Sequence, residues 1–205
     1  MEWTEATQRS PLKLYAGDIV DQSKYPDIIG LSLLYSNQNH ILHDITEMFP
    51  IQNECVDFFQ SEDVFEHIQY EKLDKVIEEI YRILKKGSIF RLSVPDYGCD
   101  VLYDRCVKNE QGEILFDPGG GGTIENPAHL WFPRIDRVQE LLDNSSFAEK
   151  GEIDYLHYYN MNSGYVLKPI DYSIGFILRT PDHDKRVQNP IRPMSLVVDL
   201  IKTNE

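Results

Sequence analysis

A strand, a helix and a second strand follow one another in residues 55–94, and this order constrains the fold more than any other feature. The helix is predicted over Leu73 to Leu84, where one apolar stripe recurs with a period of 3.6 residues and charged side chains occupy the opposite face. Lys85 and Lys86 suit the negative end of the helix dipole, and Gly87 suits the C′ position. Residues 55–59 and 88–94 are the flanking apolar strands. Two strands joined by a helix run parallel with a right-handed crossover, so we expect an α/β protein with a largely parallel sheet.

Further elements extend this unit in both directions. The pattern predicts strands at 12–16, 27–33 and 40–43, a second helix at 134–143, and extended runs at 153–159, 172–179 and 195–201. The last two runs are expected to pair as antiparallel strands. The expected architecture is a doubly wound, mostly parallel, Rossmann-like sheet with a C-terminal antiparallel strand pair. We expect one domain over residues 1–205, with irregular loops at 96–128 and 180–193.

Two loops carry unusual composition. Gly119 to Gly122 lack the spacing of a phosphate-binding loop, and a flexible surface loop or lid is the favoured interpretation. Residues 181–186 combine Asp182, His183 and Asp184 with two cations, and neighbouring side chains in an extended segment point apart. A charged hairpin loop is therefore favoured over a metal site, while a loop that closes over an acceptor or contacts a partner subunit stays open.

The composition excludes several partners. A net charge of −14 with no basic stripe repels phosphate backbones and anionic lipid surfaces, so neither nucleic acid nor a membrane is expected. Three cysteines without CxxC spacing disfavour a disulfide framework or a four-cysteine zinc site. No signal peptide or apolar run long enough to span a membrane is present in the sequence, and we expect a cytoplasmic protein.

The middle of the chain carries a resemblance. Ser61…Glu66-His67, the helix end Glu79-Ile-Tyr-Arg-Ile-Leu-Lys-Lys-Gly87 and the strand end Val94-Pro-Asp96 are similar to motifs of the class I S-adenosylmethionine-dependent methyltransferase superfamily. His129-Leu-Trp131, followed by a helix that ends near Phe147, resembles the segment after the sheet in that family. The resemblance covers about residues 12–147. It is closest to type-11-like small-molecule methyltransferases and has a degenerate glycine motif.

The resemblance implies S-adenosylmethionine as cofactor, bound at the carboxyl ends of the strands. The residues that match its binding positions are Gly17, Ser32, Asp44, Ser61 and Glu62. Gly17 matches the turn after the first strand, although Tyr15 stands where a first glycine would be. Asp44 matches the acid that contacts adenine, whereas the acid that bonds the ribose is absent and Ser32 is its substitute.

Three side chains near the expected site are candidate catalytic residues. His67 precedes the long helix and either orients the acceptor or bonds a backbone group. Asp96 ends a strand and either accepts from an acceptor hydroxyl or forms an Asx-turn. His129 follows the glycine run and is a candidate base or a structural histidine.

Two functions remain open on these grounds. One is methyl transfer to a small polar acceptor such as a sugar or metabolite hydroxyl. The other is a degenerate methyltransferase fold that acts as a binding or regulatory module. A nucleotide-binding domain for another cofactor is disfavoured, because no GxGxxG or P-loop lysine motif occurs. A homo-oligomer is left open.

Overall fold

The computed structural model describes residues 1–19, 21–162 and 164–203. An eight-stranded sheet forms its centre, with the strand order β3-β2-β1-β4-β5-β10-β8-β9. Its strands are β1 (Lys13–Ala16), β2 (Ile28–Ser32), β3 (His40–Leu42), β4 (Val56–Glu62), β5 (Leu84–Pro95), β8 (Gly151–Tyr159), β9 (Tyr165–Leu167) and β10 (Ser195–Lys202). The first five pair in parallel, and β10 runs antiparallel to both β5 and β8. The mostly parallel, Rossmann-like sheet predicted from the sequence is confirmed.

The predicted strand–helix–strand unit is confirmed as β4, α2 (Leu73–Ile83) and β5. Five side chains of the apolar stripe of α2 are buried: Leu73, Val76, Ile77, Ile80 and Ile83. The helix ends at Ile83, so the prediction that Gly87 occupies its C′ position is wrong. Gly87 lies within β5, where its φ of +81° is a left-handed conformation that favours glycine. The remaining helices are α1 (Trp3–Ala6), α3 (Asp100–Tyr103), α4 (Ile135–Asp143) and α5 (Ser146–Lys150).

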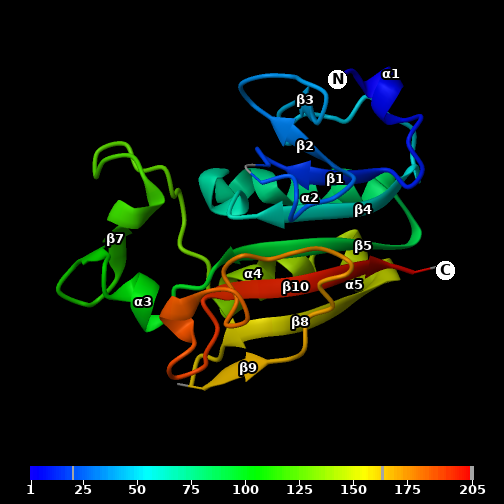
Figure 1. Ribbon diagram of the computed structural model, residues 1–205. Coiled ribbons are helices and arrows are strands. Elements are labelled where there is room, and N and C mark those ends of the chain that lie inside the picture. The colour runs from blue at the N-terminus through cyan, green and yellow to red at the C-terminus, as the bar shows by residue number, and fades with distance from the viewer. Residues whose placement is uncertain (20, 163, 204–205) are drawn as a thin grey trace.

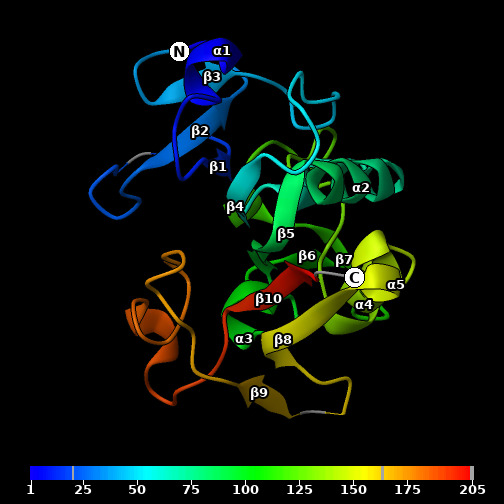
Figure 2. The same cartoon turned by 90° about the vertical axis from the view of Figure 1, so that its right-hand side faces the viewer.

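The two faces of the sheet are covered differently. Helices α2, α4 and α5 lie together on one face, where their apolar side chains join those of the central strands in the main core (Figure 2). On the other face lies the segment between β9 and β10, drawn in orange (Figure 1). Ile174 and Phe176 of this segment pack on Tyr25 and Phe58. Irregular chain rather than a helix therefore covers that face.

One predicted strand and one predicted loop differ from the structure. The segment 172–179 forms no strand, so the prediction that it pairs with 195–201 is wrong; β10 pairs with β5 and β8 instead. Residues 96–128 contain α3 and a small antiparallel pair, β6 (Val107–Lys108) and β7 (Ile114–Phe116), rather than irregular chain alone. Gly119 and Gly120 belong to a 3-10 turn over Pro118–Gly120, and Gly121 and Gly122 follow it with φ of +90° and +76°. Within the described residues, no helix combines the length and apolar character needed to cross a membrane.

Candidate functional site

The carboxyl ends of the parallel strands form one edge of the sheet, and two cavities lie there on either side of the turn after β1. The first, of about 120 Å³, is lined by Gly17, Leu31, Leu33, His43, Asp44, Ile45, Val64, His67 and Ile68. The second, of about 250 Å³, is lined from the same turn and from the end of β4 by residues that include Tyr15, Tyr25 and Glu62. In open α/β sheets ligands bind at this edge. Gly17 and Asp44, predicted as cofactor contacts, line the smaller cavity.

The turn after β1 packs beside the end of β2, where the acid that usually bonds the ribose is absent. Gly17 has a φ of +99°, which disfavours other residues there. A Cβ atom on Gly30 would lie 2.3 Å from the ring of His40, so that ring fills the space that a longer side chain would need. The Nε2 atom of His40 accepts a hydrogen bond of 2.9 Å from the backbone N–H of Ile19. His40 thus stabilises the turn through this hydrogen bond.

The other predicted cofactor residues are engaged within the chain to different degrees. The hydroxyl of Ser32 accepts from the backbone N–H groups of Leu34 and Tyr35. One carboxylate oxygen of Asp44 accepts two bonds from Thr46, and this side chain is exposed. Ser61 is fully buried, and its hydroxyl has no partner in the described part of the chain.

Glu62 is buried at the end of β4 and joins it to the segment that covers the sheet. One of its carboxylate oxygens accepts from the hydroxyl of Tyr25 at 2.8 Å, and the other accepts from the backbone N–H of Leu178 at 2.7 Å. Burial first, and then the charge of Asp63, raises the pKa of Glu62 to about 7. Glu62 lines the 250 Å³ cavity, and both of its carboxylate oxygens are bonded to other groups of the protein.

Asp96 forms the Asx-turn that was one of its two predicted roles. Its carboxylate accepts from the backbone N–H of Gly98 at 2.8 Å and from that of Tyr159 at 2.7 Å. The side chain is fully buried, and burial raises its pKa to about 6. Both oxygens are therefore engaged: one closes the local turn after β5, and the other joins β5 to the end of β8.

We expect Asp96→Asn to lower the free energy of unfolding by about 2 kcal/mol, because one buried backbone N–H would then face an amide N–H₂ instead of an oxygen. Urea denaturation measures this loss. Asp104→Asn, outside this turn, is the control and is expected to change stability by less than about 0.5 kcal/mol. A fully stable Asp96→Asn protein would contradict the structural role.

His67 and His129, separated widely in the sequence, lie against each other in the structure. Their rings meet edge to face with centroids 4.7 Å apart. Three hydrogen bonds join the two segments that carry them: His67 Nδ1 to Ala128 O (2.9 Å), Leu130 N to Glu66 O (2.8 Å) and Trp131 Nε1 to Phe65 O (2.9 Å). The structure thus brings together two of the three predicted catalytic residues, and Asp96 is engaged in its own Asx-turn.

A buried chain of polar groups supports His129. Its Nδ1 atom lies 2.6 Å from the hydroxyl of Tyr97, which donates to Asp117 at 2.6 Å. Asp117 in turn accepts two hydrogen bonds from Arg105. Burial first, and then the positive charge of His67, lowers the pKa of His129 to about 4. His129 is therefore neutral near pH 7.

Glu66 completes this cluster and was not among the predicted site residues. Its side chain is 0% exposed, and neither carboxylate oxygen accepts a hydrogen bond within the described chain. Oε1 lies 3.7 Å from His129 Nε2 and 3.9 Å from His67 Nε2. Burial first, and then the charge of Asp63, raises the pKa of Glu66 well above its ordinary value. The pair Glu66-His67 was visible as a sequence motif, but the contact with His129 was not.

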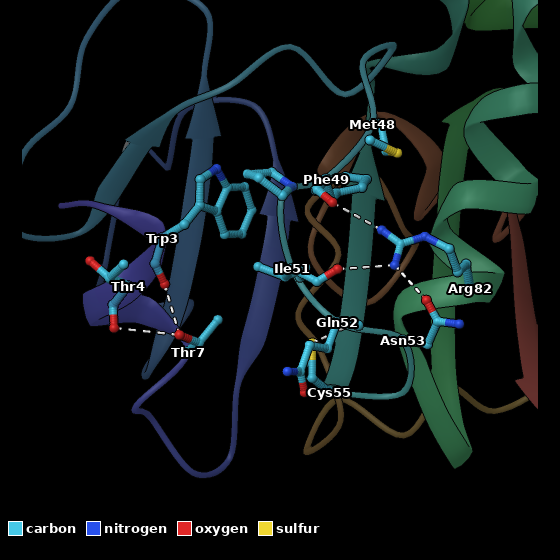
Figure 3. Close-up of a pocket in the computed structure, with 11 residues that line it drawn as sticks. Trp3, Thr4, Thr7, Met48, Phe49, Ile51, Gln52, Asn53, Cys55 and Arg82 are labelled. Carbon is cyan, nitrogen blue, oxygen red and sulfur yellow. Dashed lines mark hydrogen bonds between the residues drawn. The ribbon is translucent and has the colours of Figure 1, made fainter.

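A further cavity, an open groove, lies away from this edge, close to the start of β4. It has a volume of about 800 Å³ and is lined by side chains that include Trp3, Met48 and Arg82 (Figure 3). Arg82 donates to Glu79, to Asn53 and to the backbone oxygens of Phe49 and Ile51. Its guanidinium is thus fully engaged in holding the loop before β4, and the groove lacks a free cation or a titratable cluster among the described residues.

Comparisons with known proteins agree with this architecture. Residues 11–92 match the family model of a methyltransferase domain. The plantazolicin methyltransferase BpumL, solved in complex with SAH, has a TM-score of 0.52 at 13% identity over 98% of this chain and 79% of that chain. A SAM-dependent methyltransferase from Archaeoglobus fulgidus has a TM-score of 0.51 at 11% identity over 91% and 84%. No curated protein matches the sequence.

A third solved structure is longer than this chain. Phosphoethanolamine N-methyltransferase 2 from Haemonchus contortus has a TM-score of 0.45 at 14% identity, and the match covers 71% of this chain but 35% of that chain. The chain therefore spans about a third of that protein. The sheet order and the matched domain define a methyltransferase fold. Residues 11–92 match a methyltransferase-domain model, and the sheet has the fold of S-adenosylmethionine-dependent methyltransferases of known structure.

Proposed function

We propose that this protein transfers a methyl group from S-adenosylmethionine to a small polar acceptor, such as a sugar or metabolite hydroxyl. The observation that carries the proposal is the position of His67, which lines the cavity beside Gly17 and also contacts His129. A cofactor pocket and a cluster of polar side chains thus share one wall at the carboxyl edge of the sheet. In methyl transfer, alignment of donor and acceptor supplies much of the rate, which fits this arrangement.

The residues of the smaller cavity fit the adenine end of the cofactor. Leu31, Ile45 and Val64 provide apolar walls, and Asp44 lies at the cavity with one carboxylate oxygen not engaged by Thr46. His43 also lines it, and its Nε2 atom is buried without a partner in the described chain. A bound S-adenosylmethionine would supply a sulfonium methyl group that is open to in-line attack.

His67 and His129 are proposed to border the acceptor. A base works best when its pKa is near the working pH, so His129, with a pKa of about 4, is a poor base at neutral pH. We therefore propose that His129 positions the acceptor rather than removing a proton from it. The charge of −14 supports a small acceptor over nucleic acid. Three free cysteines support a cytoplasmic location.

Calorimetric titration with S-adenosylmethionine and S-adenosylhomocysteine tests the cofactor site. We expect micromolar binding that weakens about 10-fold in Asp44→Ala, which is the loss for one good hydrogen bond. Asp143→Ala, at an exposed position at the end of α4, is the matched control and should bind like the wild type. Equal affinities for Asp44→Ala and the wild type would reject Asp44 as the adenine contact.

A degenerate module is the second candidate function, and a specific observation favours it. The ring of His40 fills the space beside Gly30, and the Ser32 hydroxyl already accepts two backbone hydrogen bonds. The ribose therefore loses its usual carboxylate, and with it charge-assisted hydrogen bonds of about 1.5–3 kcal/mol each. No detectable binding of either ligand by the wild-type protein would support the module and direct the search to protein partners.

A further inference from the structure

Glu66, His67 and His129 each bring one potential ligand atom into a single cluster. These three atoms all lie within 4.8 Å of one another. We propose that the three residues bind a divalent transition-metal ion of the zinc class, with two imidazole nitrogens and one carboxylate as ligands. Within the described residues, no other group of three histidine, cysteine or acidic side chains forms such a cluster.

The hydrogen bonds of both histidines leave the required nitrogen free. His67 Nδ1 lies 2.9 Å from a backbone carbonyl oxygen, which only accepts, so the proton is on Nδ1. The Tyr97 hydroxyl gives its proton to Asp117 and so accepts from His129 Nδ1. Both rings therefore present an Nε2 lone pair to Glu66. Metal-bound histidines are held in this way, with the second nitrogen bonded to a carbonyl or a carboxylate network.

The burial of Glu66 without a hydrogen-bond partner is a second observation that points to a bound cation. A fully buried carboxylate ordinarily accepts hydrogen bonds or pairs with a cation, yet both of its oxygens lack a hydrogen-bond partner in the described chain. Its nearest polar neighbours are the two bare Nε2 atoms, which are acceptors in these tautomers and offer no proton. A cation between the three groups would give both Nε2 atoms and a Glu66 oxygen a shared partner.

The two ligand-bearing segments are fixed before any ion binds. Three hydrogen bonds join residues 65–67 to residues 128–131, and a Cβ atom on Gly120 would lie 2.6 Å from the ring of His129. The glycine run therefore packs its backbone directly on one ligand. Ligands of a tetrahedral zinc at about 2.0–2.1 Å lie roughly 3.4 Å apart. The Glu66 oxygen lies 3.7 and 3.9 Å from the two Nε2 atoms, and all three ligand atoms lie within 4.8 Å of one another, so the histidine rings would have to move inward when the ion binds.

Three protein ligands leave a coordination position open, as in catalytic rather than structural zinc sites. Of the three ligands only His67 is exposed, and it also lines the cavity beside Gly17, so solvent or an acceptor would reach the ion from the side of His67. A water molecule or an acceptor oxygen would complete the coordination of the ion. The ion site stands without the proposed function; if both hold, an acceptor oxygen on the ion would lie next to the cofactor pocket.

The test is titration of the chelator-treated full chain with Co²⁺, followed by visible absorption, and with Zn²⁺, followed by calorimetry, both without S-adenosylmethionine. We expect one equivalent to bind with micromolar affinity or better. Glu66→Gln and His67→Ala should each weaken binding about 10-fold or more. His183→Ala removes an exposed histidine of the 180–193 loop and should leave the affinity unchanged.

Thermal melting separates loss of the site from loss of the fold. Zn²⁺ should raise the melting temperature of the wild type but not of Glu66→Gln, and without metal the two should melt at similar temperatures. No binding below about 1 mM, or equal binding by the wild type and both variants, would overturn the proposal. Metal binding without S-adenosylmethionine binding would reject only the proposed function, and the reverse result would reject only the metal site.

Discussion

Asp199→Ala is expected to lower the free energy of unfolding by about 3–5 kcal/mol, because it leaves a buried guanidinium without its counter-charge. Arg91 on β5 is 0% exposed and donates from Nε and Nη2 to Asp199 on β10, each at 2.7 Å. Its Nη1 atom donates to the backbone oxygens of Asp171 and Gly175, at 2.8 and 2.7 Å. One side chain thus joins two central strands to the segment that covers the sheet. Urea denaturation at neutral pH measures the loss.

Asp154→Ala is the matched control. Asp154 pairs with Lys168 on the surface, where both side chains are about half exposed, so its removal should change stability by less than about 1 kcal/mol. Equal losses in the two variants would show that burial does not distinguish the pairs. Retained stability in Asp199→Ala would mean that the Arg91 guanidinium finds other partners or water.

Local patterns predicted the centre of the fold but not what covers it. The stripe on α2 and the flanking apolar strands depend on side chains close in sequence, and β4-α2-β5 follows from them. Residues 172–179 alternate apolar and polar side chains like a strand, and Ile174 and Phe176 do pack on the sheet. Their backbone, however, bonds to buried side chains: Gln60 donates to Phe176 O, and Glu62 accepts from Leu178 N. Such partners cannot be inferred from periodicity.

The sequence offered several residues of the candidate site one by one, but not Glu66 and not their arrangement. His67 and His129 were each candidates, since histidines near a strand end or after a loop are candidate acids, bases or ligands. Their contact depends on hydrogen bonds between segments more than 60 positions apart, such as that of His67 with Ala128 O. Glu66 is a candidate only because it is buried without a hydrogen-bond partner, and the sequence alone does not show this. Asp96 was ambiguous from the sequence because an Asx-turn and a ligand contact require the same residue type.

Glu62→Gln is expected to flatten the pH dependence of stability between pH 4.5 and about 7. Burial holds the pKa of Glu62 at about 7 in the folded protein, against an ordinary value of 4.5. Between these values the folded state keeps a proton that the unfolded state releases, so stability falls as the pH rises. The fall is complete above pH 7 and amounts to about 3 kcal/mol for a shift of this size. Glutamine carries no proton to release and should escape it.

The measurement is urea denaturation of the wild type and Glu62→Gln at pH 4.5, 6 and 8, without ligand. The stability of the variant minus that of the wild type should rise by about 3 kcal/mol across this range, because groups common to both cancel. Glu149→Gln, which removes an exposed carboxylate, should give a flat difference. A flat difference for Glu62→Gln would instead mean that Glu62 is ionised in the folded protein throughout, with Tyr25 and Leu178 compensating for its burial.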